Sequence, residues 1–297
     1  MVNTRIYWLH ALSPTHAGIG RGVGYIDLPI DRDGVMGWPV IRGSAFKGVW
    51  RDWAGQQNLA NLEQAFGRAD KDGESANSGA LIPTDARLVC LPVRSFRGTF
   101  AWATSPLCLQ MLRRTLELAG EKNLPTVPSG LEETKAHHAK GTALVEEKSI
   151  YLEDLDFEAV ECQTATAWAD KIGAWVFSND SAWQAQFQKR FVVLPDSAFD
   201  FLCETGTEVH SRVRIDDETK TVATRALWTE ESLPAETVLM GVVQCDRVFG
   251  RNGEDITPTG LLDRFAKVPL TLQIGGKATV GRGQVRCVFT PVNGGGQ

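Results

Sequence analysis

Residues 5–30, RIYWLHALSPTHAGIGRGVGYIDLPI, join a hydrophobic segment to a loop that contains four alternating glycines. The segment 5–12 is rich in aromatic and β-branched residues, which indicates a buried strand. His16 precedes the glycines and Asp27 follows them. Because glycine leaves backbone amides uncovered, such a loop can bring the main chain close to another molecule. We therefore expect a buried strand followed by a binding loop.

The segment 37–54, GWPVIRGSAFKGVWRDWA, predicts a second strand and then a helix with Ser44 as its N-cap. Apolar residues recur at spacings of three and four, so the helix has one apolar face. Lys47 and Arg51 share another face close to the helix N-terminus, where free amides favour a phosphate. The alternative interpretation is two solvated cations on an amphipathic helix.

The C-terminal segments VPLTLQIGG (268–276) and QVRCVFT (284–290) alternate between apolar and polar residues, which indicates half-buried strands. They are joined by GGKATVGRG, a second glycine-rich loop that carries Lys277 and Arg282. Together with the N-terminal pattern, these strands predict an α+β fold of the RRM-like or ferredoxin-like kind. A repeated βαβ order is lacking, which argues against a doubly wound sheet.

Between these ends the sequence predicts two helices and a hairpin. The helices span residues 105–119 and 180–191, and loop-like composition fills 67–87 and 120–141. Residues 209–228 read as two polar strands about a turn. Because neither face is strongly apolar, we expect this hairpin to project from the body of the protein and hold another molecule. An edge hairpin folded back on the core is the alternative.

The composition bounds the protein class. With 297 residues and 43% hydrophobic content, the chain can form one large domain with insertions or two small domains. It has no apolar run long enough for a membrane span and no evident secretory signal. Six isolated cysteines without zinc-ligand spacing suggest reduced thiols in a cytoplasmic protein.

The net charge of −5 argues at first against a nucleic-acid partner, but the charges are unevenly distributed. Residues 1–60 hold six Lys and Arg against four Asp, and the chain from Arg264 onward holds five and no acid. The segment 131–162 carries nine acids against three lysines. Because local potential governs phosphate binding, such a chain can still present a basic groove; ordinary surface scatter is the alternative.

The glycine loops do not fit the common nucleotide motifs. A GxGxxG fingerprint starting at Gly18 would need glycine at Val23, and no GxxxxGK[ST] occurs. Two glycine loops, each with a cation, suit a polynucleotide better than a single nucleotide. A small-molecule enzyme is therefore the least favoured class.

The same residues carry a family resemblance. The pattern HxGxGxGxGxxDLPI followed by GxPxIxGSxxKGxxR is similar to that of the RAMP superfamily of CRISPR-associated proteins, and within it to the backbone subunits of type III-B (Cmr) effector complexes. The segments 225–239 (RALWTEESLPAETVL) and 274–286 (IGGKATVGRGQVR) resemble further family segments. Residues 60–200 are weakly matched.

The resemblance implies an RRM-like palm from residues 1–60 with 226–297, a partly helical insertion from 61–206, and a thumb hairpin from 207–229. It implies a multi-copy helical filament on crRNA, with other Cmr subunits as partners, in the cytoplasm and without a membrane. It also implies cleavage of the paired target RNA at regular intervals with a divalent metal ion, Mg²⁺ or Mn²⁺. Pairing would read the sequence while the protein holds the backbone.

Cleavage by the 2′-hydroxyl of the RNA requires groups that place it, help remove its proton and offset phosphate charge. Asp27 matches the catalytic loop aspartate of the family and could hold the metal or take the proton. His16 matches the family histidine, with packing against the strand as its alternative. Glu230 and Glu231 match an acidic pair, and the sequence leaves open which one faces the substrate.

The cations of the two loops, of the predicted helix and of the thumb are candidates for RNA phosphates, together with the glycines and the serine beside them. This RNA-binding set comprises Gly18, Gly20, Arg21, Gly22, Gly24, Ser44, Lys47, Arg51, Arg212, Arg214, Lys277, Gly281, Arg282 and Gly283. Two alternatives share the fold: a RAMP subunit that binds guide RNA without cutting, and a standalone endonuclease for CRISPR precursor RNA.

Overall fold

A computed structural model describes residues 3–22, 24–68, 76–248, 256–267 and 269–291. Its largest sheet has the strand order β15-β16-β1-β14-β6-β7-β11-β8-β10-β9. The palm strands in this sheet are β1 (Thr4–Ala11), β6 (Ala86–Arg94), β14 (Val238–Gln244), β15 (Leu270–Gln273) and β16 (Gln284–Pro291). The order β16-β1-β14-β6 is 4-1-3-2 in chain sequence, and all these pairs are antiparallel. This arrangement confirms the predicted RRM-like, ferredoxin-like palm.

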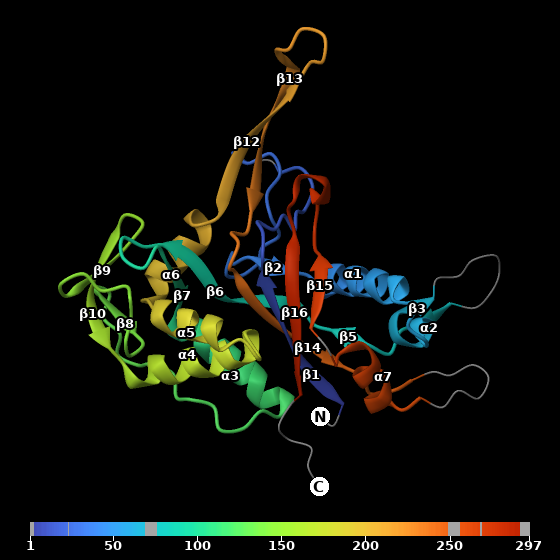
Figure 1. Cartoon of the computed structure of the whole chain (residues 1–297), viewed down its shortest axis with the longest axis horizontal. Coiled ribbons are helices and arrows are strands. Elements are labelled where there is room, and N and C mark those ends of the chain that lie inside the picture. Colours follow the sequence, from blue (N-terminus) through green and yellow to red (C-terminus); the bar gives the residue numbers. More distant parts are fainter. Residues whose placement is uncertain (1–2, 23, 69–75, 249–255, 268, 292–297) are drawn as a thin grey trace.

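The central strand β1 is buried on both faces, so helices cover both sides of the palm (Figure 1). Tyr7 and Leu9 belong to a core with α1 (Gly43–Gln56) and α7 (Pro258–Phe265). Ile6 and Trp8 belong to the opposite core, with α3 (Pro106–Ala119) and α4 (Gln163–Val176). Strand alternation sends successive side chains to opposite faces, which explains why this segment is hydrophobic throughout.

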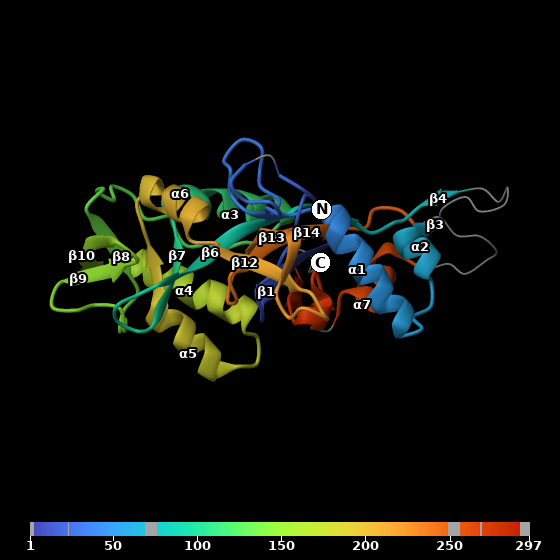
Figure 2. The same cartoon turned by 90° about the horizontal axis from the view of Figure 1, so that it is seen from above.

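The insertion between β6 and β14 extends the same sheet away from the palm. It adds β7 (Phe100–Thr104), β8 (Lys135–His138), β9 (Ser149–Leu152), β10 (Leu155–Glu161) and β11 (Phe191–Val193), with helices α5 (Ser181–Arg190) and α6 (Asp196–Thr205). The smaller elements are β2 (Val40–Ile41), α2 (Leu62–Phe66), β3 (Gly67–Arg68), β4 (Asn77–Ser78), β5 (Ile82–Pro83) and the 3₁₀ turn Ala278–Val280. Figures 1 and 2 place β8–β10 and α2 at opposite ends of the molecule.

Four sequence expectations differ from the structure, and one of them is the expected loop 67–87, which contains the short strands β3, β4 and β5. Strands β5 and β6 pair with β14, so part of the predicted insertion 61–206 belongs to the palm sheet. Ser44 lies inside α1 and is not its N-cap; the amide of Gly43 donates instead to Asp85 Oδ1 at 2.8 Å. The expected loop 120–141 contains β8, which the two flanking strands specify through long-range pairing.

The thumb hairpin consists of β12 (Glu208–Ile215) and β13 (Val222–Ser232) and projects from the body as expected (Figure 1). Pairing places Val213 opposite Leu227 and Arg212 opposite Trp228. Because cross-strand partners share a face, the middle of the thumb has an apolar pair on one side and a basic and aromatic pair on the other. The sequence pattern of each strand alone did not reveal the exposed apolar side, where Leu227 is 67% exposed.

Two expectations about the class of protein concern membrane-spanning helices and the state of the cysteines. Within the described residues, no helix is long and apolar enough to cross a membrane. All six cysteines are free thiols, and five of them are buried.

Candidate RNA interface and cleavage site

The two glycine-rich loops lie side by side, joined through their main chains. The amide of Gly276 donates to the carbonyl oxygen of His16 at 3.0 Å, and that of Gly283 donates to Pro14 at 2.9 Å. Loops separated by about 250 residues in the sequence therefore form one continuous surface. This adjacency is the arrangement that a trough for a phosphate backbone requires.

Close approach of the loops makes glycine necessary at particular positions. At Gly275, φ is +81° and an added Cβ would lie 2.1 Å from the carbonyl oxygen of His16. Gly283 is similar, since a Cβ there would lie 2.2 Å from the carbonyl oxygen of Ile274. At Gly281, φ is +78° but no atom lies within 4 Å of the added Cβ.

Because Gly275 is confined and Gly281 is open, replacing each by alanine should lower the free energy of unfolding by different amounts. Gly275→Ala should lower the free energy of unfolding by more than about 2 kcal/mol, because a positive φ and a backbone overlap act together. Gly281→Ala is the matched control and should cost only about 1 kcal/mol from the positive φ. Urea titration of the RNA-free protein measures both. Equal losses would mean that the contact between the loops does not constrain Gly275.

Asp27 is exposed at the outer edge of the first loop and is held by the thumb. Its Oδ2 accepts hydrogen bonds from the Thr229 amide at 2.8 Å and the Thr229 hydroxyl at 3.0 Å. The amide of Asp27 donates to Thr229 Oγ1 at 2.9 Å. The hydrogen bonds from Thr229, the backbone amide first, lower the pKa of Asp27. The carboxylate is thus ionised at neutral pH, with Oδ1 free of hydrogen bonds from the described residues.

His16 lies beneath the first loop and not on its surface. It is 7% exposed, and its Nδ1 lies 2.6 Å from the carbonyl oxygen of Glu231, so Nδ1 carries the proton in that hydrogen bond. The ring packs against Gly18, where an added Cβ would lie 2.4 Å from His16 Nε2. The structure thus favours a role for His16 in shaping the loop, and its role in proton transfer stays a prediction.

Glu231 is a buried structural residue at the base of the thumb. Only 2% of it is exposed, and its Oε1 bonds Arg32 Nη2 at 2.5 Å and Thr207 Oγ1 at 2.8 Å. Its Oε2 accepts from the amide of Ile30 at 3.0 Å. Both oxygens are therefore occupied within the protein, and the side chain connects the thumb to the end of the DLPI segment.

Glu230 is also buried, at 3% exposure, but its partners are predicted RNA-binding cations. Its Oε1 lies 2.6 Å from both Lys277 Nζ and Trp228 Nε1, and its Oε2 lies 3.4 Å from Arg212 Nε. Burial by itself raises the pKa of Glu230, but the hydrogen bonds from Lys277 and Trp228 outweigh it and hold that pKa below its ordinary value. Of the acidic pair, Glu230 is the member next to groups that can meet RNA.

The predicted phosphate-binding cations fall into different environments. Arg21 and Arg214 are exposed. Lys47 and Arg51 are half-buried and make no hydrogen bond or ion pair with a described residue, and burial followed by the charge of Arg51 lowers the pKa of Lys47. Arg282 is 8% exposed and donates to Ser232 Oγ at 2.9 Å, so it supports the base of the thumb.

The serine and the remaining glycines of the predicted RNA-binding set also differ from one another in exposure and in the space around them. Ser44, Gly20 and Gly24 are exposed, and no atom lies within 4 Å of a Cβ added at either glycine. Gly22 is more confined, since an added Cβ would lie 2.9 Å from the carbonyl oxygen of Ile26. Open main chain is thus available at Gly20 and Gly24, and also at Gly281.

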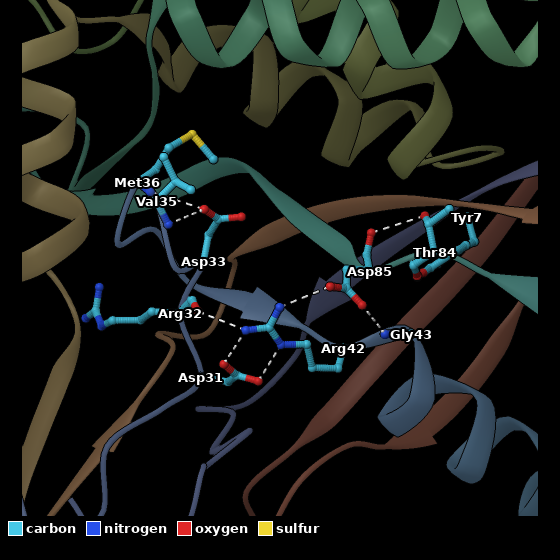
Figure 3. A network of polar contacts seen from close by, with 10 residues as sticks. All are labelled: Tyr7, Asp31, Arg32, Asp33, Val35, Met36, Arg42, Gly43, Thr84 and Asp85. Atoms are coloured by element: carbon cyan, nitrogen blue, oxygen red, sulfur yellow. Dashed lines mark hydrogen bonds and ion pairs between the residues drawn. The ribbon is translucent and has the colours of Figure 1, made fainter.

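A charged network that the sequence analysis missed anchors the first loop to α1 (Figure 3). Arg42 binds Asp31 through Nε at 2.7 Å and Nη2 at 2.8 Å, and it reaches Asp85 Oδ2 at 3.1 Å. Asp33 caps its own turn by accepting from the amides of Val35 and Met36. The acids that follow DLPI are therefore occupied in holding the loop.

The described residues do not form a metal site by themselves. They contain no group of three or more His, Cys, Asp or Glu side chains placed to hold an ion. Asp27 offers one free carboxylate oxygen at the loop edge. That is fewer ligands than a site built from protein alone needs, although Mg²⁺ is commonly held by one or two carboxylates together with substrate phosphates.

Comparison with known proteins identifies the family. The RAMP superfamily matches residues 8–286. The chain belongs to the RAMP superfamily. The CRISPR system Cmr endoribonuclease Cmr4 of Pyrococcus furiosus is 33% identical to this RAMP protein over 297 residues, covering 97% of this chain and 96% of that protein.

Solved structures of RAMP proteins share the fold. Oligomeric Cmr4 from Pyrococcus furiosus superposes with a TM-score of 0.76 at 25% identity, covering 99% of this chain and 100% of that chain. A chain of the type III-B Cmr-beta complex bound to cognate target RNA gives a TM-score of 0.74 at 20% identity, covering 96% of each chain. The fold of nearly the whole chain is thus shared with these structures.

Proposed function

We propose that this chain is the backbone subunit of a type III-B CRISPR effector complex, where it holds crRNA and cuts the target RNA paired to it. The observation that carries this proposal is the adjacency of the two glycine loops with Asp27 exposed at their edge. The Pyrococcus relative, which matches nearly the full length, is named an endoribonuclease. Copies of this chain would stack along the guide, together with other Cmr subunits.

The chain's own residues would bind and orient the RNA. Open main chain at Gly20, Gly24 and Gly281 lets the phosphate backbone approach, and Arg21 with Lys47 supplies positive charge. The 2′-oxygen attacks the adjacent phosphorus while the bond to the 5′-oxygen breaks, which yields a 2′,3′-cyclic phosphate and a 5′-hydroxyl. The proton leaves the 2′-hydroxyl for a base in solution, and the leaving oxygen takes one from water.

The hydrogen bonds from Thr229, which lower the pKa of Asp27, support one of the two roles expected for it. A carboxylate stabilised by two hydrogen bonds is a weak proton acceptor, so Asp27 orients the 2′-hydroxyl or holds a cation. The proposed cleavage site also contains a divalent ion, Mg²⁺ or Mn²⁺. Asp27 would be its ligand from the protein, and RNA oxygens and water would be its other ligands. Bound there, it would offset charge on the phosphate.

A map of cut positions tests this function. The complex assembled on guide RNA is given a labelled, fully paired target, and the products are resolved at single-nucleotide resolution. We expect evenly spaced cuts, 2′,3′-cyclic phosphate ends and loss of cleavage with EDTA. A single cut would favour a processing endonuclease, and retained pairing without any cut would favour a subunit that only binds guide RNA. Cleavage that persists in EDTA would remove the metal from the proposal.

A further inference from the structure

A groove beneath the first glycine loop has the lining of a pocket for an unstacked base, and its lining includes Ile26, the residue before Asp27. It has a volume of about 600 Å³ and lies between the first glycine loop, the turn at Met36 and helix α6. Ile19, Tyr25 and Met36 contribute apolar surface to it. Asp200 and Glu204 contribute carboxylates on the α6 side, which would repel a phosphate but not a neutral base.

The side chain of Tyr25, which lines this groove, does not contribute to the packing of the fold. It is 104% exposed, so the ring makes essentially no contact with the protein. The carbonyl oxygen of Tyr25 lies 3.3 Å from Thr229 Oγ1, and the single hydroxyl proton there is shared with Asp27 Oδ2 at 3.0 Å. A free aromatic ring therefore lies two residues from the candidate catalytic carboxylate in the sequence.

The proposed chemistry needs a base to leave the stack at this point. In a stacked A-form strand the 2′-oxygen is not in line with the bond to the leaving 5′-oxygen, so the nucleotide at the cut must rotate. Bases that are splayed from RNA are commonly held by stacking on aromatic side chains. Tyr25 offers such a ring next to Asp27.

The side-chain donors of Trp38 and Arg32, which line the groove, are already bonded within the protein. Trp38 Nε1 donates to Asp200 at 2.8 Å, and Arg32 is occupied by Glu231 and by the carbonyl oxygens of Gly37 and Cys203. Few donors remain to read base edges, so capture by stacking would accept any base. This suits an enzyme whose target is chosen by guide pairing.

We propose that the groove is a nucleobase site and that Tyr25 is a positioning residue, which stacks on the target base displaced beside the cut. The inference rests on the function proposed above. It predicts cleavage at every base, with a modest advantage for purines because they have the larger stacking surface.

The test compares Tyr25→Ala and Tyr25→Phe in the guide-bound complex under single-turnover conditions. We expect Tyr25→Ala to cleave about tenfold more slowly and Tyr25→Phe to stay within about threefold of the unmodified protein. Val35→Ala is the matched control, since Val35 is 95% exposed and does not line the groove. Tyr25→Ala at the full rate, or Tyr25→Phe as slow as Tyr25→Ala, would overturn the proposal.

Targets with an abasic nucleotide on either side of the cut separate stacking from a structural role. At the stacking position, the abasic target should be cut at the same rate by the unmodified protein and by Tyr25→Ala. If Tyr25→Ala slows abasic and intact targets equally, Tyr25 acts through the protein and the proposal is wrong.

A second readout does not depend on cleavage. In the Asp27→Asn background, 2-aminopurine at the stacking position should be quenched by Tyr25 and become at least about twofold brighter in Tyr25→Ala, since the ring no longer covers the base. Unchanged fluorescence at every target position would overturn the base site. Failure of Asp27→Asn to stop cleavage would instead count against the proposed function.

Discussion

Asp27→Asn should slow target cleavage by about 100-fold or more while leaving guide binding and target pairing intact. Asparagine has nearly the same shape and can accept the hydrogen bond from the Thr229 amide, so the loop stays in place. The change removes the negative charge that orients the 2′-hydroxyl or holds a cation. Guide affinity should not fall, because a carboxylate does not attract phosphate. Single-turnover rates with gel-shift titration of the guide measure both effects.

Asp33→Asn is the matched control for this substitution. Asp33 lies six residues further along the chain and accepts hydrogen bonds from the amides of Val35 and Met36, a capping role that asparagine also fills. Its cleavage rate should remain within about twofold of the unmodified protein. An Asp27→Asn complex that cuts at the full rate would contradict the catalytic assignment. Equal losses in both variants would indicate damage to the loop.

Glu231→Ala should lower the free energy of unfolding by about 3–5 kcal/mol, as expected when one partner of a buried ion pair is removed. The change leaves Thr207 and the amide of Ile30 without this acceptor at the thumb base, and it removes the ion pair of Arg32, which keeps only backbone carbonyl partners. Glu231→Gln should lose roughly half as much, because one amide oxygen can replace only part of the carboxylate. Urea titration of the RNA-free protein gives these values.

Two comparisons distinguish a structural from a catalytic Glu231. Glu204→Ala, at an exposed site on α6, should change stability by less than about 0.5 kcal/mol. Complexes that contain folded Glu231→Gln should still cleave, because both carboxylate oxygens of Glu231 point into the protein. Loss of cleavage without loss of stability would show that Glu231 faces the substrate after all.

Much of the palm could be predicted from the sequence, because strand and helix periodicity are local properties. Alternation in 270–273 and 284–290 indicated β15 and β16, and Leu270, Leu272 and Val285 are buried as that pattern requires. The membership of β6 in the palm was not predictable, because its pairing with β14 depends on residues about 150 positions away. Ser44 was misplaced because the cap of α1 comes from Asp85, on a distant segment.

At the site, the sequence by itself determined the two glycine loops and the exposed acid at the end of the first one. These are properties of short segments, in which residue type sets backbone freedom and charge. Only the tertiary structure decided that the loops adjoin, that Thr229 holds Asp27, and that Glu231 and Arg282 are buried. Asp27 and Glu231 depend on contacts with segments 202 and 199 residues away, and Arg282 on Ser232, 50 residues away; contacts at such separations leave no periodic signal in either segment.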